Sequence, residues 1–107
     1  MWVIKTLNSV VDAEIDNLPD DLKPHFSRIM ELIIAKGLER TGMPHVRHLR
    51  GSIWEIRFHG RGSIGRALYA TAAGKKIILL RVFAKKSQKT PPREIALALK
   101  RLEILQS

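Results

Sequence analysis

Three arginine side chains occupy positions from which neighbouring strands could present them together to a phosphate group. Alternating apolar residues and short glycine-containing turns predict three consecutive strands: residues 53–58, 63–71 and 76–83. Successive side chains on a strand point to opposite faces, so Arg57, Arg66 and Arg81 share one face. Guanidinium groups bind phosphate oxygens through paired hydrogen bonds, which makes this face a candidate phosphate-binding surface.

Symmetric hairpin turns would pair Glu55 with Arg66, Arg57 with Ile64, and Arg66 with Arg81. We call this side of the sheet the arginine face, and its other expected members are Phe83, Ile53, Leu68 and Leu79. The opposite face is expected to pack against helices with an apolar set: Trp54, Ile56, Phe58, Tyr69, Ile78, Leu80 and Val82. One carboxylate cannot neutralise three guanidinium groups, so we expect a wet arginine face. The alternative to phosphate binding is a solvated face without a ligand, in which Glu55 and Arg66 form an ordinary cross-strand ion pair.

The charge distribution also favours a phosphate-rich partner. Residues 1–44 hold five Lys/Arg and seven Asp/Glu, a net charge of −2, whereas residues 45–107 hold fourteen and three, a net charge of +11. A localised positive field of this size attracts polyanions through the release of counterions from phosphates. RNA is the expected partner, and we regard Lys86, Lys89, Arg61, Lys76 and Phe83 as candidate RNA contacts.

The remaining elements predict a single α+β domain over residues 1–107. An N-terminal strand over residues 1–7 and the three-stranded meander form a small antiparallel sheet, packed against two N-terminal helices. Ser9 and Asp12 are expected to cap the first helix, and Gly37 is expected to end the second. Residues 38–51 are expected to be irregular, and Thr90-Pro91-Pro92 predicts the start of a C-terminal helix.

The composition excludes several classes of protein. The chain has no cysteine, so disulfides, thiolate metal sites and a cysteine nucleophile are absent. The N-terminus lacks the pattern of a signal peptide and the longest apolar runs are too short to span a bilayer, so we expect a cytoplasmic protein without a membrane partner. His45 and His48 are a weak zinc signal, so no metal or other cofactor is expected. His59 is a candidate general acid, although its more ordinary interpretation is a turn residue.

Nearly the whole chain resembles the HigB-type, phage-derived toxins of the RelE/ParE superfamily. The most specific segment is residues 83–95, FAKKSQKTPPREI, followed by Ala98 and Arg101. Residues 53–57 and 66–69 match the middle strands of that family. The resemblance implies a RelE-like fold and an mRNA interferase of a type II toxin–antitoxin system. Such a protein cuts messages in the A site of the 70S ribosome and is inhibited by a cognate antitoxin, often a helix-turn-helix protein.

The resemblance also implies a reaction and roles for individual residues. Arg66 and Arg81 match catalytic arginine positions, and Lys85 and Lys86 match a lysine pair. The reaction is metal-independent: the RNA 2′-hydroxyl attacks the adjacent phosphorus, which needs a base, an acid and positive charge at the phosphate. Arg57, Arg66 and Arg81 suit the phosphate, and Lys85 is the candidate base. Two alternatives stay open: a non-enzymatic, gyrase-inhibiting ParE-like toxin, or an inactive relative that binds only RNA or an antitoxin.

Overall fold

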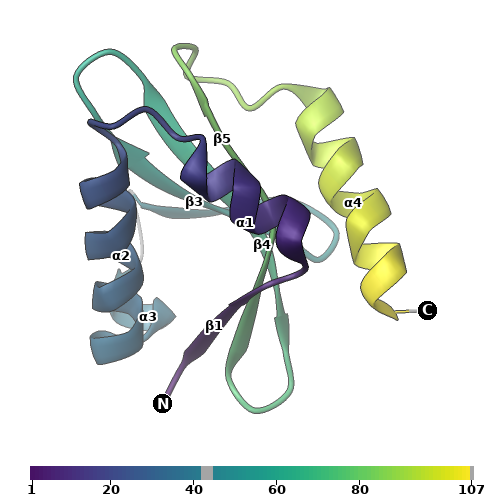
Figure 1. Cartoon of the computed structure of the whole chain (residues 1–107). Coiled ribbons are helices and arrows are strands. Elements are labelled where there is room, and N and C mark those ends of the chain that lie inside the picture. The colour runs from purple at the N-terminus through teal and green to yellow at the C-terminus, as the bar shows by residue number, and fades with distance from the viewer. Residues whose placement is uncertain (42–44, 107) are drawn as a thin grey trace.

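The computed structural model describes residues 1–41 and 45–106 of the chain. Its helices and strands follow one another as β1 (Val3–Thr6), α1 (Ser9–Asp16), α2 (Lys23–Lys36), α3 (Leu38–Thr41), β2 (Val46–Arg50), β3 (Ile53–His59), β4 (Ile64–Ala72), β5 (Lys76–Lys85) and α4 (Pro92–Gln106). The strands form one five-stranded sheet in the order β1-β5-β4-β3-β2. Figure 1 shows α2 and α4 on opposite sides of this sheet.

The predicted α+β class is confirmed, with two differences in the sheet. The N-terminal strand β1 pairs with β5 in parallel, so the sheet is mixed and not antiparallel throughout. The segment expected to be irregular contains the short helix α3 and the strand β2, which pairs with β3. This strand was missed because its charged residues hide the alternation on which strand prediction depends.

The helix ends follow local sequence signals. Asn8, and not Ser9, caps α1: its side chain accepts hydrogen bonds from the backbone N–H groups of Val10 and Val11. Pro24 lies in the first turn of α2, where a missing N–H costs least. Gly37 ends α2 with a φ of 87°, a left-handed conformation that glycine adopts without strain. Both the predicted stop at Gly37 and the predicted start of the C-terminal helix at Pro92 are confirmed.

The sheet separates two apolar clusters. On one face, α1 and α2 pack against the sheet through Val11, Ile33, Ile56 and Tyr69, among others. On the other face, α4 contributes Ala98 and Leu102 to a smaller cluster with residues of β3, β4 and β5: Ile53, Leu68, Ala70, Ile78, Leu80 and Phe83. The helices therefore lie in layers on both sides of the sheet, and α4 covers the side that carries the arginines.

Beside the arginines, both hairpins pair two residues away from the predicted register. Arg57 lies opposite Arg66, and Arg66 lies opposite Phe83. A shift of two residues preserves the face to which each side chain points. Arg57, Arg66, Arg81 and Glu55 therefore still share a face, although the predicted partners were wrong.

An irregularity in β5 reverses the faces predicted for part of that strand. The register between β4 and β5 shifts at Leu68/Tyr69, which leaves Leu80 as an extra residue between Leu79 and Arg81. Leu80 and Ile78 therefore pack under α4, and Leu79 packs under α1 and α2, the reverse of the prediction.

Trp54 was also placed wrongly. It points to the predicted face but belongs to neither apolar cluster, and 39% of it is exposed. Its ring instead contacts His48 in β2, with 5.0 Å between the ring centroids. Trp54 is therefore not the buried core residue that the alternation predicted.

The packing of Phe58 on Gly65 gives a test of this register. A Cβ at position 65 would lie 2.0 Å from Cε2 of Phe58, whose buried ring is held edge-on against Phe26. Gly65→Ala is therefore expected to lower the free energy of unfolding by about 1–3 kcal/mol, the usual cost of overpacking. Gly62→Ala, where the new Cβ meets nothing within 4 Å, is the matched control in urea unfolding. Equal stability of the two variants would show that the predicted contact is absent in solution.

Candidate functional site

The arginine face contains a buried cluster of one carboxylate and two guanidinium groups. Glu55 and Arg57 lie two residues apart on β3, and Arg66 lies directly opposite Arg57 on β4. The exposed fractions are 0% for Glu55, 7% for Arg57 and 0% for Arg66. We call these three residues the Glu55 cluster.

Glu55 binds a different partner through each carboxylate oxygen. Its Oε1 lies 2.6 Å from Nε of Arg57. Its Oε2 accepts a hydrogen bond from the Thr90 hydroxyl and lies 3.9 Å from Nε of Arg66. One negative charge thus faces two positive charges, so the cluster carries a net positive charge inside the protein.

Two backbone carbonyls cover the outer side of the cluster. The oxygen of Ser87 accepts a hydrogen bond from Nη2 of Arg66, and the oxygen of Gln88 accepts one from Nη2 of Arg57. We call residues 86–90, which carry these carbonyls and Thr90, the covering loop. A carbonyl supplies only a partial negative charge, so this loop satisfies hydrogen bonds without neutralising the cluster.

Arg66 has hydrogen-bonding capacity to spare. Its Nε and Nη1 are buried and make no hydrogen bond to the described residues. Burial, followed by the nearby charge of Arg57, lowers the pKa of Arg66 from its ordinary value, and Glu55 offsets only part of this. Buried N–H groups without acceptors are costly, so an anion that reached Arg66 would gain favourable contacts with them.

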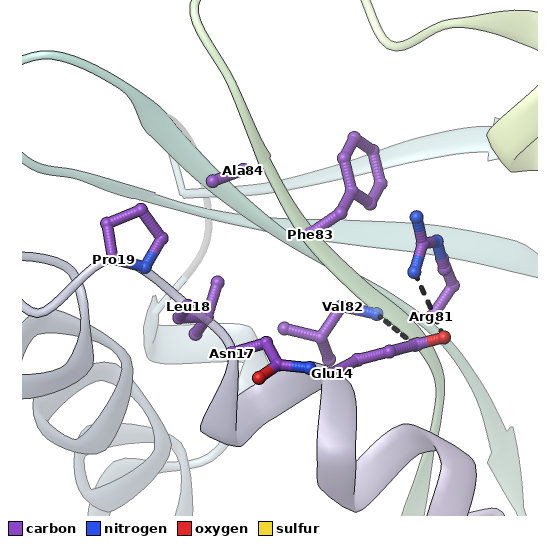
Figure 2. Close-up of a pocket in the computed structure, with 8 residues that line it drawn as sticks. All are labelled: Glu14, Asn17, Leu18, Pro19, Arg81, Val82, Phe83 and Ala84. Carbon is purple, nitrogen blue, oxygen red and sulfur yellow. Dashed lines mark hydrogen bonds and ion pairs between the residues drawn. The ribbon is translucent and has the colours of Figure 1, made fainter.

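Arg81 lies on the same face but is neutralised by carboxylates. It donates to both oxygens of Glu94 at 2.9 and 3.2 Å, and its Nη1 lies 3.0 Å from Oε2 of Glu14. Figure 2 shows Glu14 reaching from α1 towards Arg81, along the pocket between α1 and β5. Burial alone would lower the pKa of Arg81, but hydrogen bonds and charges from Glu94 and Glu14 raise it overall. Arg81 therefore connects α1, β5 and α4.

Phe83 lies between the two arginine systems. The guanidinium carbons of Arg66 and Arg81 lie 5.9 and 5.2 Å from its ring centroid. The ring is 7% exposed and belongs to the cluster under α4. In this arrangement Phe83 packs against guanidinium groups and is not displayed on the surface.

The expectation of a wet arginine face was wrong. The same face continues into Ile53, Leu68 and Ala70, which need apolar cover, and the apolar stripe of α4 supplies it. Once α4 lies there, the covering loop that leads into it must pass over the arginines. In the sequence Thr90 is visible only as a helix-start signal, and Glu14 and Glu94 have no apparent role, because partners so distant in sequence leave no local pattern.

The candidate lysines and turn residues lie at two ends of the sheet. Lys85 is half-buried and lies opposite Ile64, which itself pairs with His59. His59, Lys85 and the exposed Arg61 therefore share one end of the sheet, together with the exposed lysines of the covering loop, Lys86 and Lys89. Lys76 begins β5 and lies nine positions before Lys85, roughly 30 Å away along the strand. The structure does not bring Lys76 to the Glu55 cluster.

The described part of the chain offers no site for a metal ion. No group of three or more His, Cys, Asp or Glu side chains is placed to hold one among residues 1–41 and 45–106. The chemistry available at this end of the sheet is that of cations, hydrogen-bond donors and one imidazole. Such a set can bind and stabilise a phosphate group.

The five-stranded sheet with helices on both faces defines an α+β domain compatible with the RelE-like fold. A family model described as Phage derived protein Gp49-like (DUF891) matches residues 13–103. The chain belongs to this family, which is a family of RelE/HigB-like toxins. No curated protein matches the chain significantly. None of the described helices is both long enough and apolar enough to cross a membrane.

The Glu55 cluster predicts that Glu55→Gln lowers stability much more than the same substitution at the exposed Glu103. Glu55→Gln keeps the size of the side chain but leaves two buried guanidinium groups without a counter-charge. We expect it to lower the free energy of unfolding by about 3–5 kcal/mol, as for other buried ion pairs that lose one member. Glu103→Gln, at an exposed position of α4, is the control and should change stability little. Urea unfolding checks both, and a stable Glu55→Gln variant would mean that the arginines are hydrated in solution.

Proposed function

We propose that this protein is the toxin of a type II toxin–antitoxin system and acts as a ribosome-dependent mRNA endoribonuclease of the HigB type. Membership of the Gp49-like family is consistent with a toxin of such a system. The observation that best supports the nuclease activity is the net positive Glu55 cluster, with buried donors of Arg66 that lack acceptors. A phosphodiester supplies the acceptors and the negative charge that the cluster lacks.

Binding in the cluster requires the covering loop to move. The carbonyls of Ser87 and Gln88 occupy the positions from which phosphate oxygens would approach Arg66 and Arg57. Displacing them replaces two neutral acceptors by an anion, which favours the phosphate as long as its desolvation is compensated. Lys86 and Lys89 are exposed on the same loop and would attract the RNA backbone to it.

The proposed reaction needs no cofactor. The RNA 2′-hydroxyl attacks the adjacent phosphorus, and the 5′-oxygen of the next nucleotide leaves. Arg57 and Arg66 stabilise the charge on the phosphoryl oxygens, Lys85 removes the proton of the 2′-hydroxyl, and His59 protonates the leaving oxygen. Arg81 is a weaker candidate for the phosphate, because Glu14 and Glu94 compensate its charge.

The proposed partners are mRNA in the A site of the 70S ribosome and an inhibitory antitoxin, which we propose to be a helix-turn-helix protein. Family membership supports an antitoxin partner. The ribosome enters the proposal because the described residues offer a single candidate acid, and it lies at an exposed strand end. A ribosome that holds the message in a reactive geometry would make good this incomplete set of groups.

A second function is supported by the same burial of the arginines. A covered cluster also fits an inactive relative that only binds RNA or an antitoxin and uses Glu55, Arg57 and Arg66 to hold the covering loop in place. The gyrase-inhibiting alternative has less support, because such a toxin has no use for a cluster with a net positive charge and spare phosphate donors. The following two experiments separate these functions.

Expression of the chain alone is expected to arrest growth and to produce messages cut within translated regions. Arg66→Lys keeps a positive charge beside Glu55 but loses the planar, multidentate group, so cleavage should fall by at least about 100-fold. Mapping of RNA 5′ ends in induced cells measures this, with thermal melting as the test of folding. Lys100→Gln, on an exposed site of α4, should remain as toxic as the wild type. Growth arrest with intact messages and altered DNA supercoiling would contradict the nuclease activity and support the gyrase-inhibiting alternative.

The purified protein is expected to bind naked RNA with a strong dependence on salt, but to cut it slowly or not at all. It should cut the same message efficiently in a programmed ribosome, because the ribosome supplies the positioning. EDTA should leave the chemistry unchanged once ribosome integrity is controlled. The measurement is a cleavage time course with both substrates. Equally fast cutting of free RNA would contradict ribosome dependence, and no cutting of either would support the inactive relative.

A further inference from the structure

A pocket of about 260 Å³ lies where β3 extends past the beginning of β2. Strand pairing with β2 reaches Ile56, and the last contact on this side is a hydrogen bond from the N–H of Arg57 to the carbonyl of His45. Phe58 and His59 continue without a neighbouring strand on that edge, and α2 runs alongside. The pocket is lined by His25, Arg28, Ile29, Leu32, His45, Arg57, Phe58 and His59.

The polar part of this lining is basic. His25 and Arg28 come from α2, His45 precedes β2, and His59 ends β3. The side chains of these four residues make no hydrogen bond or ion pair with the described part of the chain. No aspartate or glutamate lines the pocket. Donors that are not neutralised and converge on one cavity favour an anionic ligand.

The rest of the lining is apolar and fixed in place. Ile29 and Phe58 are 7% and 3% exposed, and the Phe58 ring is held edge-on by Phe26. An apolar wall next to basic groups suits a ligand with a flat ring and a phosphate, because the ring packs on the wall while the phosphate accepts hydrogen bonds. The volume is slightly below the roughly 300 Å³ at which small-molecule sites begin, which limits the ligand to about one nucleotide.

We propose that this pocket binds one nucleotide of a single-stranded RNA, as a subsite separate from the Glu55 cluster. The proposal rests on the proposed function in one respect, namely that RNA is the substrate. Arg57 borders both sites: it lines the pocket at the end of β3, while its guanidinium group lies on the α4 side and binds Glu55 and the covering loop. The pocket lies on the α2 side of the sheet and the Glu55 cluster on the α4 side, so a nucleotide in the pocket would add affinity for RNA on the face opposite the proposed cleavage site.

The test measures binding of a short fluorescent oligouridylate by anisotropy, in an Arg66→Lys background that prevents cleavage. Arg28→Gln should weaken binding by at least about tenfold, the scale of one lost charge-assisted contact. Lys100→Gln removes the same charge from an exposed site on the other side of the sheet and should change binding less than about twofold. His25→Ala changes no formal charge and should also weaken binding. Equal effects of Arg28→Gln and Lys100→Gln would overturn the proposal, since only the overall charge would then matter.

Two further arms identify the ligand and separate this proposal from the nuclease. In a titration, free uridine 5′-monophosphate should bind much more weakly than the oligonucleotide. Tighter binding of the free nucleotide would overturn the proposed RNA subsite. Cleavage of a ribosome-bound message by the wild type is measured in parallel. If Arg28→Gln loses RNA binding and the wild type cuts no message, the proposed pocket is supported and the proposed nuclease activity is contradicted. If the wild type cuts the message and both pocket variants bind RNA as the wild type does, the nuclease activity is supported and the pocket proposal is contradicted.

Discussion

The carboxylate of Glu55 is fully buried and binds, or lies next to, groups from three parts of the fold. It pairs with Arg57 on its own strand, faces Arg66 on β4, and accepts the hydroxyl hydrogen of Thr90 just before α4. Without this single negative charge, two guanidinium groups would lie together in a space that water cannot reach. The path of the covering loop, and with it the attachment of α4 to the sheet, therefore depends on this carboxylate.

A second ion network holds the same helix at its other contacts. Glu14 of α1 binds both Arg81 and Arg101, and Arg101 also donates to the carbonyl of Leu80. The bond from the Val82 N–H to Glu14 satisfies the edge of β5 beyond the last residue paired with β1. Two layers on opposite faces of the sheet are thus joined around its edge by charge. The arginines therefore fall into two sets: the positive charge around Arg81 is balanced by carboxylates, whereas the positive charge around Arg66 is balanced only in part.

The sequence predicted the fold class and the shared face of the arginines, but not their environment. The arginines were placed on the correct face although both hairpin registers beside them were predicted wrongly, because the error there was two residues, an even number. The extra residue Leu80 could not be foreseen, because an irregularity of one residue leaves no mark in a run of apolar side chains. The burial of Arg57 and Arg66 was missed for a different reason. It depends on α4 returning to the sheet, a contact between segments far apart in the chain.

The covering loop contacts the arginines through main-chain carbonyls, and this affects how the protein can evolve. Substitution of Ser87 or Gln88 leaves the backbone oxygens in place, so mutation can alter both side chains while the contact persists. Selection on this cover would act on the number of residues between β5 and α4, and on the proline-rich turn that sets their direction. Insertions and deletions, more than replacements, are therefore the changes by which descendants of this protein would gain or lose the cover over their arginines.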